Sequence, residues 1–175
     1  MESVAEAGSK ESVKPTKAKR CKTMANVFSF KMRVVSDNID VLERFKNILQ
    51  GDDEKLCLLC DDAVMGDSWQ KEDLFYYEFS GVKRGSLLDW FGKTGEKCRR
   101  EANKGVTCGQ RVNTLEQLCK KLKIGVHVFA KDEDGCGGRQ LVTVHHDGKC
   151  EYMELRFSNG YGRFDNLKTI YGNAA

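Results

Sequence analysis

The sequence has a single proline and no long apolar run. A membrane-spanning helix needs about 18 to 20 consecutive apolar residues, and the N-terminus lacks the apolar core of a signal peptide. These absences argue against a membrane-embedded protein and against export by that route, so we expect a cytoplasmic protein. Disulfides seldom persist in the cytoplasm, and the eight cysteines should therefore be reduced thiols.

A recognisable catalytic set is also missing. Gly92-Lys93-Thr94 has the ending of a phosphate-binding loop, but the glycine that this motif needs five positions earlier is Leu87. No Ser/His/Asp or Cys/His arrangement carries a family signature, and no local pairing of carboxylates separates an acid from a base. We predict a protein that is not an enzyme, with no catalytic residues and no cofactor.

Two groups of side chains have the chemistry of metal ligands but not the spacing. The first group consists of Cys57, Cys60, Cys98 and Cys108. Its first pair has CxxC spacing, whereas its second pair is too far apart for a zinc knuckle. His145 and His146 are adjacent in an expected strand, so they should point to opposite faces of the sheet. We expect structural thiols and no metal, with a zinc site or a redox pair as alternatives.

Residues 1–23 differ from the rest of the chain in composition. They hold the only proline, six basic residues, three acidic residues and few apolar side chains. Such a segment cannot offset the entropy lost on ordering, so we predict a disordered basic tail. The tail accounts for the whole net charge of +3, since residues 24–175 have equal numbers of each sign. We interpret it as a solvated extension, with nucleic-acid contact as the alternative.

The most informative stretch runs from Val112 to Phe157. Thr114 and Gln117 have the spacing of a capping box, which predicts the start of a helix. The apolar stripe of this helix consists of Leu115, Leu118 and Leu122. Gly125 stands where a left-handed residue would close the helix. We therefore predict a helix that lays its leucine stripe on a core.

Three strands should follow this helix. Residues 126–130 and 140–146 have strand character, and a glycine-rich loop separates them. Asp147-Gly148 is a favoured pair for a type I′ turn, so residues 149–157 should return antiparallel to the preceding strand. The expected order is helix, strand and hairpin.

The N-terminal half begins with an alternating strand over residues 26–35. A helix should follow, capped by Ser36, Asp37 or Asn38 and closed by Gly51. Its expected core stripe consists of Ile39, Leu42, Phe45 and Leu49. Beyond it we expect short strands over 56–60 and 74–79, a helical turn over 86–91, and a long exposed loop from Gly92 to Gly109.

This order of elements predicts a single α+β domain over residues 24–157. We expect a ferredoxin-like fold, in which a mostly antiparallel sheet carries two main helices on one face. Residues 158–175 have glycines at short intervals and should form a loosely ordered C-terminal segment.

Three features resemble a known family. Met24-Ala25-Asn26 leads into an alternating strand, a helix covers 113–123, and KLKIGVHVFAKDEDGCGG precedes a strand and Asp-Gly. Over about residues 24–155 they resemble the YubB-like small proteins of phages, plasmids and other mobile elements. That family has an "MxN" strand, a ferredoxin-like fold and an "EPGxGF" type of loop, which here reads EDGCGG. The resemblance implies the fold and brings no agreed activity, so no site residue is carried over.

Charge is segregated along the chain. Residues 51–78 contain nine acidic and two basic residues, whereas residues 93–123 contain nine basic and three acidic residues. The acidic candidates for partner binding are Asp52, Asp53, Glu54, Asp61 and Asp62. The basic candidates for nucleic-acid or partner binding, in the expected loop, are Lys93, Lys97, Arg99, Arg100, Lys104 and Arg111. Alternatively, the two stretches neutralise each other within the fold.

Two hypotheses for function follow. The first is a non-catalytic protein-interaction module, a mobile-element inhibitor of a host nucleic-acid-guided defence enzyme (anti-CRISPR-like), whose partner is a host or phage protein. In it the acidic segment would occupy a basic nucleic-acid channel. The second is an accessory protein that binds nucleic acid through phosphate contacts of the basic residues in 93–111. The sequence does not fix the oligomeric state.

Overall fold

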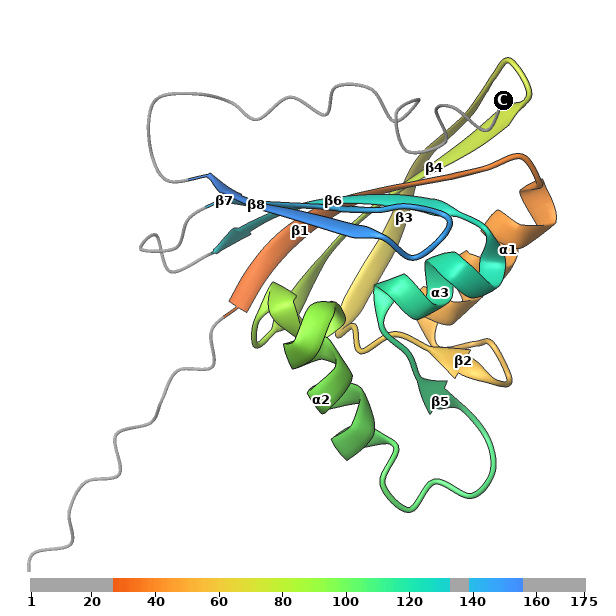
Figure 1. Ribbon diagram of the computed structural model, residues 1–175. Helices are drawn as coiled ribbons and strands as arrows, with labels where there is room; N and C mark the ends of the chain where they lie inside the picture. The colour runs from red at the N-terminus through yellow and green to blue at the C-terminus, as the bar shows by residue number, and fades with distance from the viewer. Residues whose placement is uncertain (1–26, 133–138, 156–175) are drawn as a thin grey trace, which may run out of the picture.

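The computed structural model describes residues 27–132 and 139–155 (Figure 1). The predictions for the tail 1–23, the "MxN" start, the loop 133–138 and the segment 158–175 therefore lie outside the described residues.

Six strands form one antiparallel sheet in the order β3-β4-β1-β6-β7-β8. They are β1 (Val27–Ser36), β3 (Asp62–Lys71), β4 (Leu74–Arg84), β6 (Gly125–Asp132), β7 (Arg139–Val144) and β8 (Cys150–Leu155). A separate parallel pair joins β2 (Leu56–Cys57) to β5 (Arg111–Val112). The helical elements are α1 (Ile39–Gln50), the 3-10 turn η1 (Leu87–Trp90), α2 (Gly92–Ala102) and α3 (Leu115–Leu122). The expected α+β class with a mostly antiparallel sheet is confirmed.

The central strand β1 has the alternating pattern that its sequence predicts. Its core-facing side chains are Phe28, Phe30, Met32 and Val34, all of them buried. Ser29, Lys31 and Arg33 alternate with them and belong to the other face. Because β1 pairs with both β4 and β6, these two rows run through the middle of the sheet.

Helix α1 packs against the core face of the sheet and has the predicted ends. The side chain of Asn38 accepts a hydrogen bond from the backbone N of Asp40 at 2.9 Å, and Gly51 closes the helix with φ 80°. Leu42, Phe45 and Leu49 are buried as expected. The prediction for Ile39 was wrong: it is 45% exposed, because it is the first residue of the helix, ahead of the turns that pack on the sheet.

Helix α3 begins at the predicted capping box. The backbone N of Gln117 donates to Thr114 Oγ1 at 3.3 Å, and the backbone N of Thr114 donates to Gln117 Oε1 at 3.4 Å. The leucine stripe is buried. The predicted role of Gly125 was wrong, because Lys123 takes the left-handed conformation, with φ 57°. Ile124 then enters the core and Gly125 begins β6.

Strands β7 and β8 form the predicted antiparallel hairpin. The predicted type I′ turn was wrong, because it needs a positive φ at both Asp147 and Gly148, and of the two only Gly148 has one, at 86°. The backbone N of Gly148 donates to the carbonyl of His145 at 2.8 Å, so His146 and Asp147 are the central residues of the turn and Gly148 follows them.

Strand β3 was not predicted. It is an edge strand whose residues are mostly exposed, so it lacks an apolar repeat, and its register shifts between Met65 and Ser68.

Helix α2 occupies most of the segment that was expected to be an exposed loop. The segment is helical because η1 leads into it and its polar side chains pair along one turn, as between Glu96 and Arg99. Its buried position is Gly95, where an added Cβ would lie 2.9 Å from the backbone of Trp90. A helix that buries a glycine instead of a leucine stripe leaves little periodic signal in its sequence.

Candidate functional site

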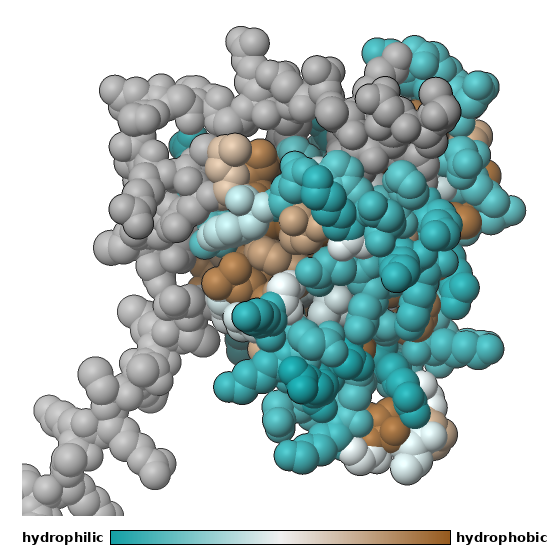
Figure 2. All heavy atoms as spheres, viewed as in Figure 1, coloured by the Kyte–Doolittle hydropathy of each residue, from teal (hydrophilic) through white to brown (hydrophobic). Residues whose placement is uncertain are grey.

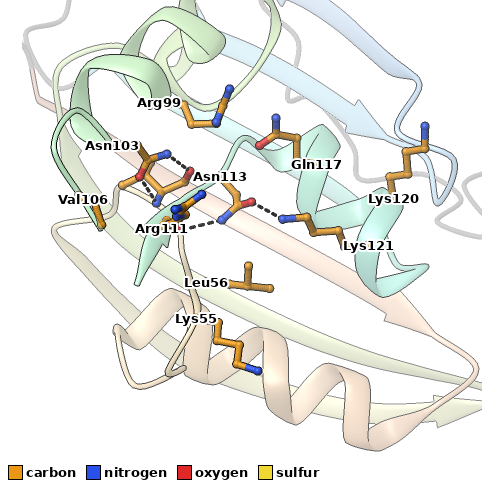
Figure 3. Close-up of a pocket in the computed structure, with 11 residues that line it drawn as sticks. Lys55, Leu56, Arg99, Asn103, Val106, Arg111, Asn113, Gln117, Lys120 and Lys121 are labelled. Atoms are coloured by element: carbon orange, nitrogen blue, oxygen red, sulfur yellow. Dashed lines mark hydrogen bonds between the residues drawn. The ribbon is translucent and has the colours of Figure 1, made fainter. Parts of the chain in front are cut away.

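A pocket of about 430 Å³ lies beside the two-stranded sheet, between the end of α2 and helix α3 (Figure 3). Its lining comes from four separate parts of the chain. The lining residues are Lys55, Leu56, Arg99, Asn103, Val106, Arg111, Val112, Asn113, Gln117, Lys120 and Lys121. Figure 2, in the view of Figure 1, shows hydrophilic side chains over much of α2 and α3.

Backbone pairing brings these segments together. The backbone N of Arg111 donates to the carbonyl of Lys55 at 2.9 Å, and that of Asn113 donates to the carbonyl of Cys57 at 2.9 Å. The side chain of Asn103 completes the wall, since its Oδ1 accepts from Val112 N and its Nδ2 donates to Val112 O, both at 2.8 Å. One amide side chain thus fastens the end of α2 to β5.

The lining carries positive charge only. Five of its side chains are cations: Lys55, Arg99, Arg111, Lys120 and Lys121. Of the residues that the structure describes, no Asp or Glu lines the pocket. Within the described part of the chain, Lys55, Arg111 and Lys120 are exposed and form no ion pair. The pocket is therefore a region of positive potential that an anion would neutralise.

Arg99 is held in place by Glu96, one turn earlier in α2. Its Nε donates to Glu96 Oε2 at 3.0 Å, and a second guanidinium nitrogen donates to Glu96 Oε1. The hydrogen bond from Arg99 lowers the pKa of Glu96, and the same bond raises the pKa of Arg99. This fork fixes the plane of the guanidinium group and neutralises part of its charge.

Asn113 holds a second cation in place. This asparagine is buried, and its Oδ1 accepts a hydrogen bond from Lys121 Nζ at 2.8 Å, as Figure 3 shows. Its Nδ2 donates to the carbonyl of Arg111 at 2.6 Å. Both ends of the Asn113 amide are therefore bonded. Because an amide is neutral, it holds Lys121 in place without neutralising the positive charge of the lysine.

The structure separates the six basic residues that the sequence singled out. Arg99 and Arg111 line the pocket. The other four are Lys93, Lys97, Arg100 and Lys104, all exposed. Their spacing of four, three and four residues sets them along one exposed side of α2 and the turn after it. Because the expected loop is a helix, its six basic side chains are divided between the pocket and the exposed side of α2.

Three of the five pocket cations, Lys55, Lys120 and Lys121, were not among the candidate site residues chosen from the sequence. Lys120 and Lys121 belong to the basic stretch 93–123, but as residues of the last turn of α3 they have an ordinary reason to be basic. Lys55 lies inside the acidic stretch and gave no signal. Only the pairing of β2 with β5 brings it to the pocket, and strands of two residues are too short to recognise in a sequence.

The five acidic candidates belong to two places in the chain, the turn after α1 and the start of β3. Two of them have structural roles. Asp53 Oδ2 accepts from Arg44 Nε at 2.9 Å, and its Oδ1 accepts from the backbone N of Lys55 and of Leu56. Asp61 Oδ2 accepts from the backbone N of Arg84 at 2.6 Å. The other three, which are exposed, are Asp52, Glu54 and Asp62.

The ranges 27–132 and 139–155 contain no assembled metal site. No three His, Cys, Asp or Glu side chains there are grouped to hold a metal ion. Burial raises the pKa of Cys60 to about 11 and that of Cys150 to about 12, so both thiols are protonated at neutral pH.

Comparison with known proteins finds no matching family model, no matching curated protein and no matching solved structure. No helix within the described ranges combines the length and the apolar composition needed to cross a membrane. The geometry of the basic pocket is therefore the basis for assigning a function.

Proposed function

We propose that this protein is a non-catalytic nucleic-acid-binding protein whose basic pocket takes phosphate groups of the backbone. The observation behind the proposal is that the described residues of the lining include five cations and no carboxylate. Its volume of about 430 Å³ lies in the range of small-ligand sites, roughly 300 to 1,000 Å³. A site of this size takes one or two nucleotides of a longer strand.

The polar groups of the pocket favour phosphate over base recognition. Arginine and lysine supply most phosphate contacts in nucleic-acid complexes, and amide side chains add hydrogen bonds to phosphate or sugar. Arg111 and Lys120 have no ion-pair partner among the described residues, so both cations are available to a phosphate. The amide of Gln117 is already bonded, since its Oε1 accepts from Thr114 N and its Nε2 donates to Glu96 Oε2. The lining within 27–132 and 139–155 contains no aromatic residue, so these residues offer no platform for stacking a base. Binding should therefore depend little on sequence.

The ferredoxin-like fold and the kinship with YubB-like proteins also belong to this proposal. The strand order β3-β4-β1-β6 supports the fold, because β1, α1, β3, β4, α3 and β6 then follow one another as a split βαβ pair. The hairpin β7–β8 extends that sheet at one edge. The mobile-element origin and the cytoplasmic location stay predictions.

The binding of a host or phage protein, as an anti-CRISPR-like inhibitor of a host defence enzyme, also stays a prediction. The exposed carboxylates of Asp52, Glu54 and Asp62 would be the ones available to such a partner. Because Asp53 and Asp61 already hold backbone amides, this acidic surface is smaller than its sequence implied. The basic pocket is the more completely assembled of the two sites.

The test is a fluorescence-anisotropy titration of the full chain with labelled mixed-sequence DNA and RNA oligonucleotides. We expect binding at about 50 mM salt that weakens steeply as salt rises. If three phosphates are neutralised, affinity for a single strand should fall about 20-fold between 50 and 200 mM salt, following counterion release. Absence of binding at 50 mM salt to every oligonucleotide would overturn the proposal.

A further inference from the structure

The sheet has a second face that none of the described helices covers. Figure 1 shows α1, α2 and α3 on one side of the sheet. On the opposite side, Val35 of β1 is 0% exposed and Tyr76 of β4 is 4% exposed. These two residues form a buried cluster separate from the main core, with Leu74 packed against it.

A polar row on the same face is also buried at its centre. The strand registers place Glu78, Arg33, His127, Thr143 and Glu151 side by side across five strands. His127 is 8% exposed, and its Nδ1 lies 3.0 Å from Thr143 Oγ1. Burial, followed by the nearby charge of Arg33, lowers the pKa of His127 to about 4. An imidazole on an open sheet face would be solvated, so this face has a cover.

The margins of this face are apolar. Four of the six residues in one cross-strand row are apolar; the row consists of Val64, Ser80, Lys31, Phe129, Leu141 and Met153. Trp69 stacks on Tyr76 with ring centroids 5.2 Å apart, and the guanidinium of Arg33 lies 5.5 Å from the centre of the Trp69 ring. With its apolar margins and its buried centre, this face has the composition of a surface on which another segment packs.

We propose that the C-terminal segment, residues 156–175, docks on this face of the sheet. Strand β8 is an edge strand that ends at Leu155, so the segment starts at the border of the face. The apolar side chains it supplies are Phe157, Tyr161, Phe164, Leu167, Ile170 and Tyr171. These side chains could pack against the apolar residues of the sheet face.

The segment is long enough to cross the sheet. Neighbouring strands lie about 4.8 Å apart, so the distance from β8 to β3 across the six-stranded sheet is about 24 Å. Twenty residues span about 30 Å as a helix and up to about 70 Å when extended. Every part of the face is within reach in either conformation.

The other parts of the chain outside the described residues fit this face less well. Residues 1–26 contain no aromatic residue, no leucine and no isoleucine, and six of them are basic. Residues 133–138 read EDGCGG and offer one apolar side chain. The C-terminal segment is thus the part of the chain whose composition matches the apolar rows.

This docking leaves the two sides of the molecule with different roles. The basic pocket lies among the helices, on the side opposite the covered face. The segment therefore occupies the sheet surface without blocking the pocket, and the inference does not depend on the proposed function.

The test uses the full chain with Phe164→Asp, Leu167→Asp and Ile170→Asp combined. In the unaltered protein, His127 should titrate near pH 4 by NMR; in the variant its pKa should rise by at least one unit towards the ordinary value. Acrylamide quenching of tryptophan should also increase, by up to about twofold, because Trp69, which is 37% exposed, becomes more exposed while Trp90 stays buried in the core. The matched control, Ser158→Asp, Asn166→Asp and Asn173→Asp, adds the same charge at polar positions and should change neither readout.

A second measurement covers the case in which the triple variant does not fold. In the unaltered protein, nuclear Overhauser contacts should join the methyl groups of Val35 and Leu141 to aromatic protons of Phe164 or Tyr171. The absence of such contacts, or an unchanged His127 pKa in a folded variant, would overturn the inference. Contacts found only between differently labelled molecules would overturn it too, since a second copy would then cover the face.

Discussion

Four of the five cations of the basic pocket come from the stretch 93–123, whereas the acidic candidates come from the oppositely charged stretch 51–78, and the fold uses the two groups of charges in different ways. In the pocket, five cations from separate segments converge, and among the described residues only Arg99 of these five forms an ion pair with a carboxylate. In the acidic segment, Asp53 and Asp61 bind backbone amides and an arginine of the same chain. One stretch assembles a site, whereas part of the other holds the scaffold together.

The difference shows that clustering of charge along the sequence is not the same as clustering in space. Asp53 is adjacent to backbone groups that would otherwise lack partners in the turn after α1, so its charge is satisfied locally. Arg111 and Lys120 face no such groups in the described residues, and their charges stay available. Substitutions on either side of this comparison should therefore affect different properties of the protein.

The largest effect should come from reversing two pocket charges. Arg111→Glu with Lys120→Glu removes two phosphate contacts and adds two repulsive charges, so affinity for an oligonucleotide should fall at least about 100-fold, or about 2.8 kcal/mol. Lys97→Glu with Arg100→Glu makes the same change of net charge on the exposed side of α2. That control should lose less than about tenfold in the same anisotropy titration. Equal losses in the two variants would contradict a pocket and favour a diffuse basic field.

Asp53→Ala should reduce stability rather than binding. It removes a largely buried carboxylate that accepts three hydrogen bonds, and such losses cost about 2 kcal/mol. Urea denaturation at pH 7 measures the change in the free energy of unfolding.

The same substitution has a predicted pH dependence. Burial raises the pKa of Asp53, but the hydrogen bonds from Arg44, Lys55 and Leu56 outweigh burial and leave the pKa below its usual value of 3.8. A depressed carboxyl pKa stabilises the fold above the unfolded pKa and loses that effect as pH falls through the folded pKa. The gap between wild type and variant should therefore narrow below about pH 3.8. A gap that widens there would contradict the assigned role.

Glu96→Gln should raise affinity modestly. The carboxylate of Glu96 neutralises part of the Arg99 charge at the pocket, so its replacement by a neutral amide releases that charge. We expect oligonucleotide binding to tighten about two- to fivefold at low salt, with most of the gain lost at high salt. Weaker binding would mean that Glu96 chiefly orients Arg99, and Arg99→Lys should then be equally harmful.

The smallest effect should come from Asp52→Asn with Glu54→Gln. Both side chains are exposed and form no hydrogen bond or ion pair with the described residues. The free energy of unfolding should change by less than about 0.5 kcal/mol, and oligonucleotide affinity by less than twofold. Loss of a protein partner from this variant alone would instead support the predicted host or phage protein interaction.

Elements with a strong local signal could be predicted from the sequence. The capping box at Thr114 and the αL glycine at position 51 each fix a backbone conformation through their own atoms. Likewise, the alternating apolar residues of β1 fix which side of the strand faces the core. The Asp147-Gly148 pair correctly predicted where the hairpin turns but not the type of turn, since of the two only Gly148 has a positive φ.

The elements that were missed depend on contacts between distant segments. Strand β3 is exposed at the sheet edge, α2 buries a glycine, and β2 with β5 are two residues each. The pocket depends on the pairing of β2 with β5. The candidate site residues therefore included two of its five cations, Arg99 and Arg111, but the sequence could not show that the five lie together. The proposed nucleic-acid partner was predicted as the alternative, from charge alone.

The most direct test of the central claim is an NMR titration of isotope-labelled full chain with a short mixed-sequence oligonucleotide. If the pocket binds the oligonucleotide, shift changes should concentrate on the backbone amides of Lys55, Arg99, Arg111 and Lys120, with small changes at Asp61 and Asp62. Shift changes confined to the outer side of α2, around Lys93 and Lys97, or an absence of any change at low salt, would contradict it.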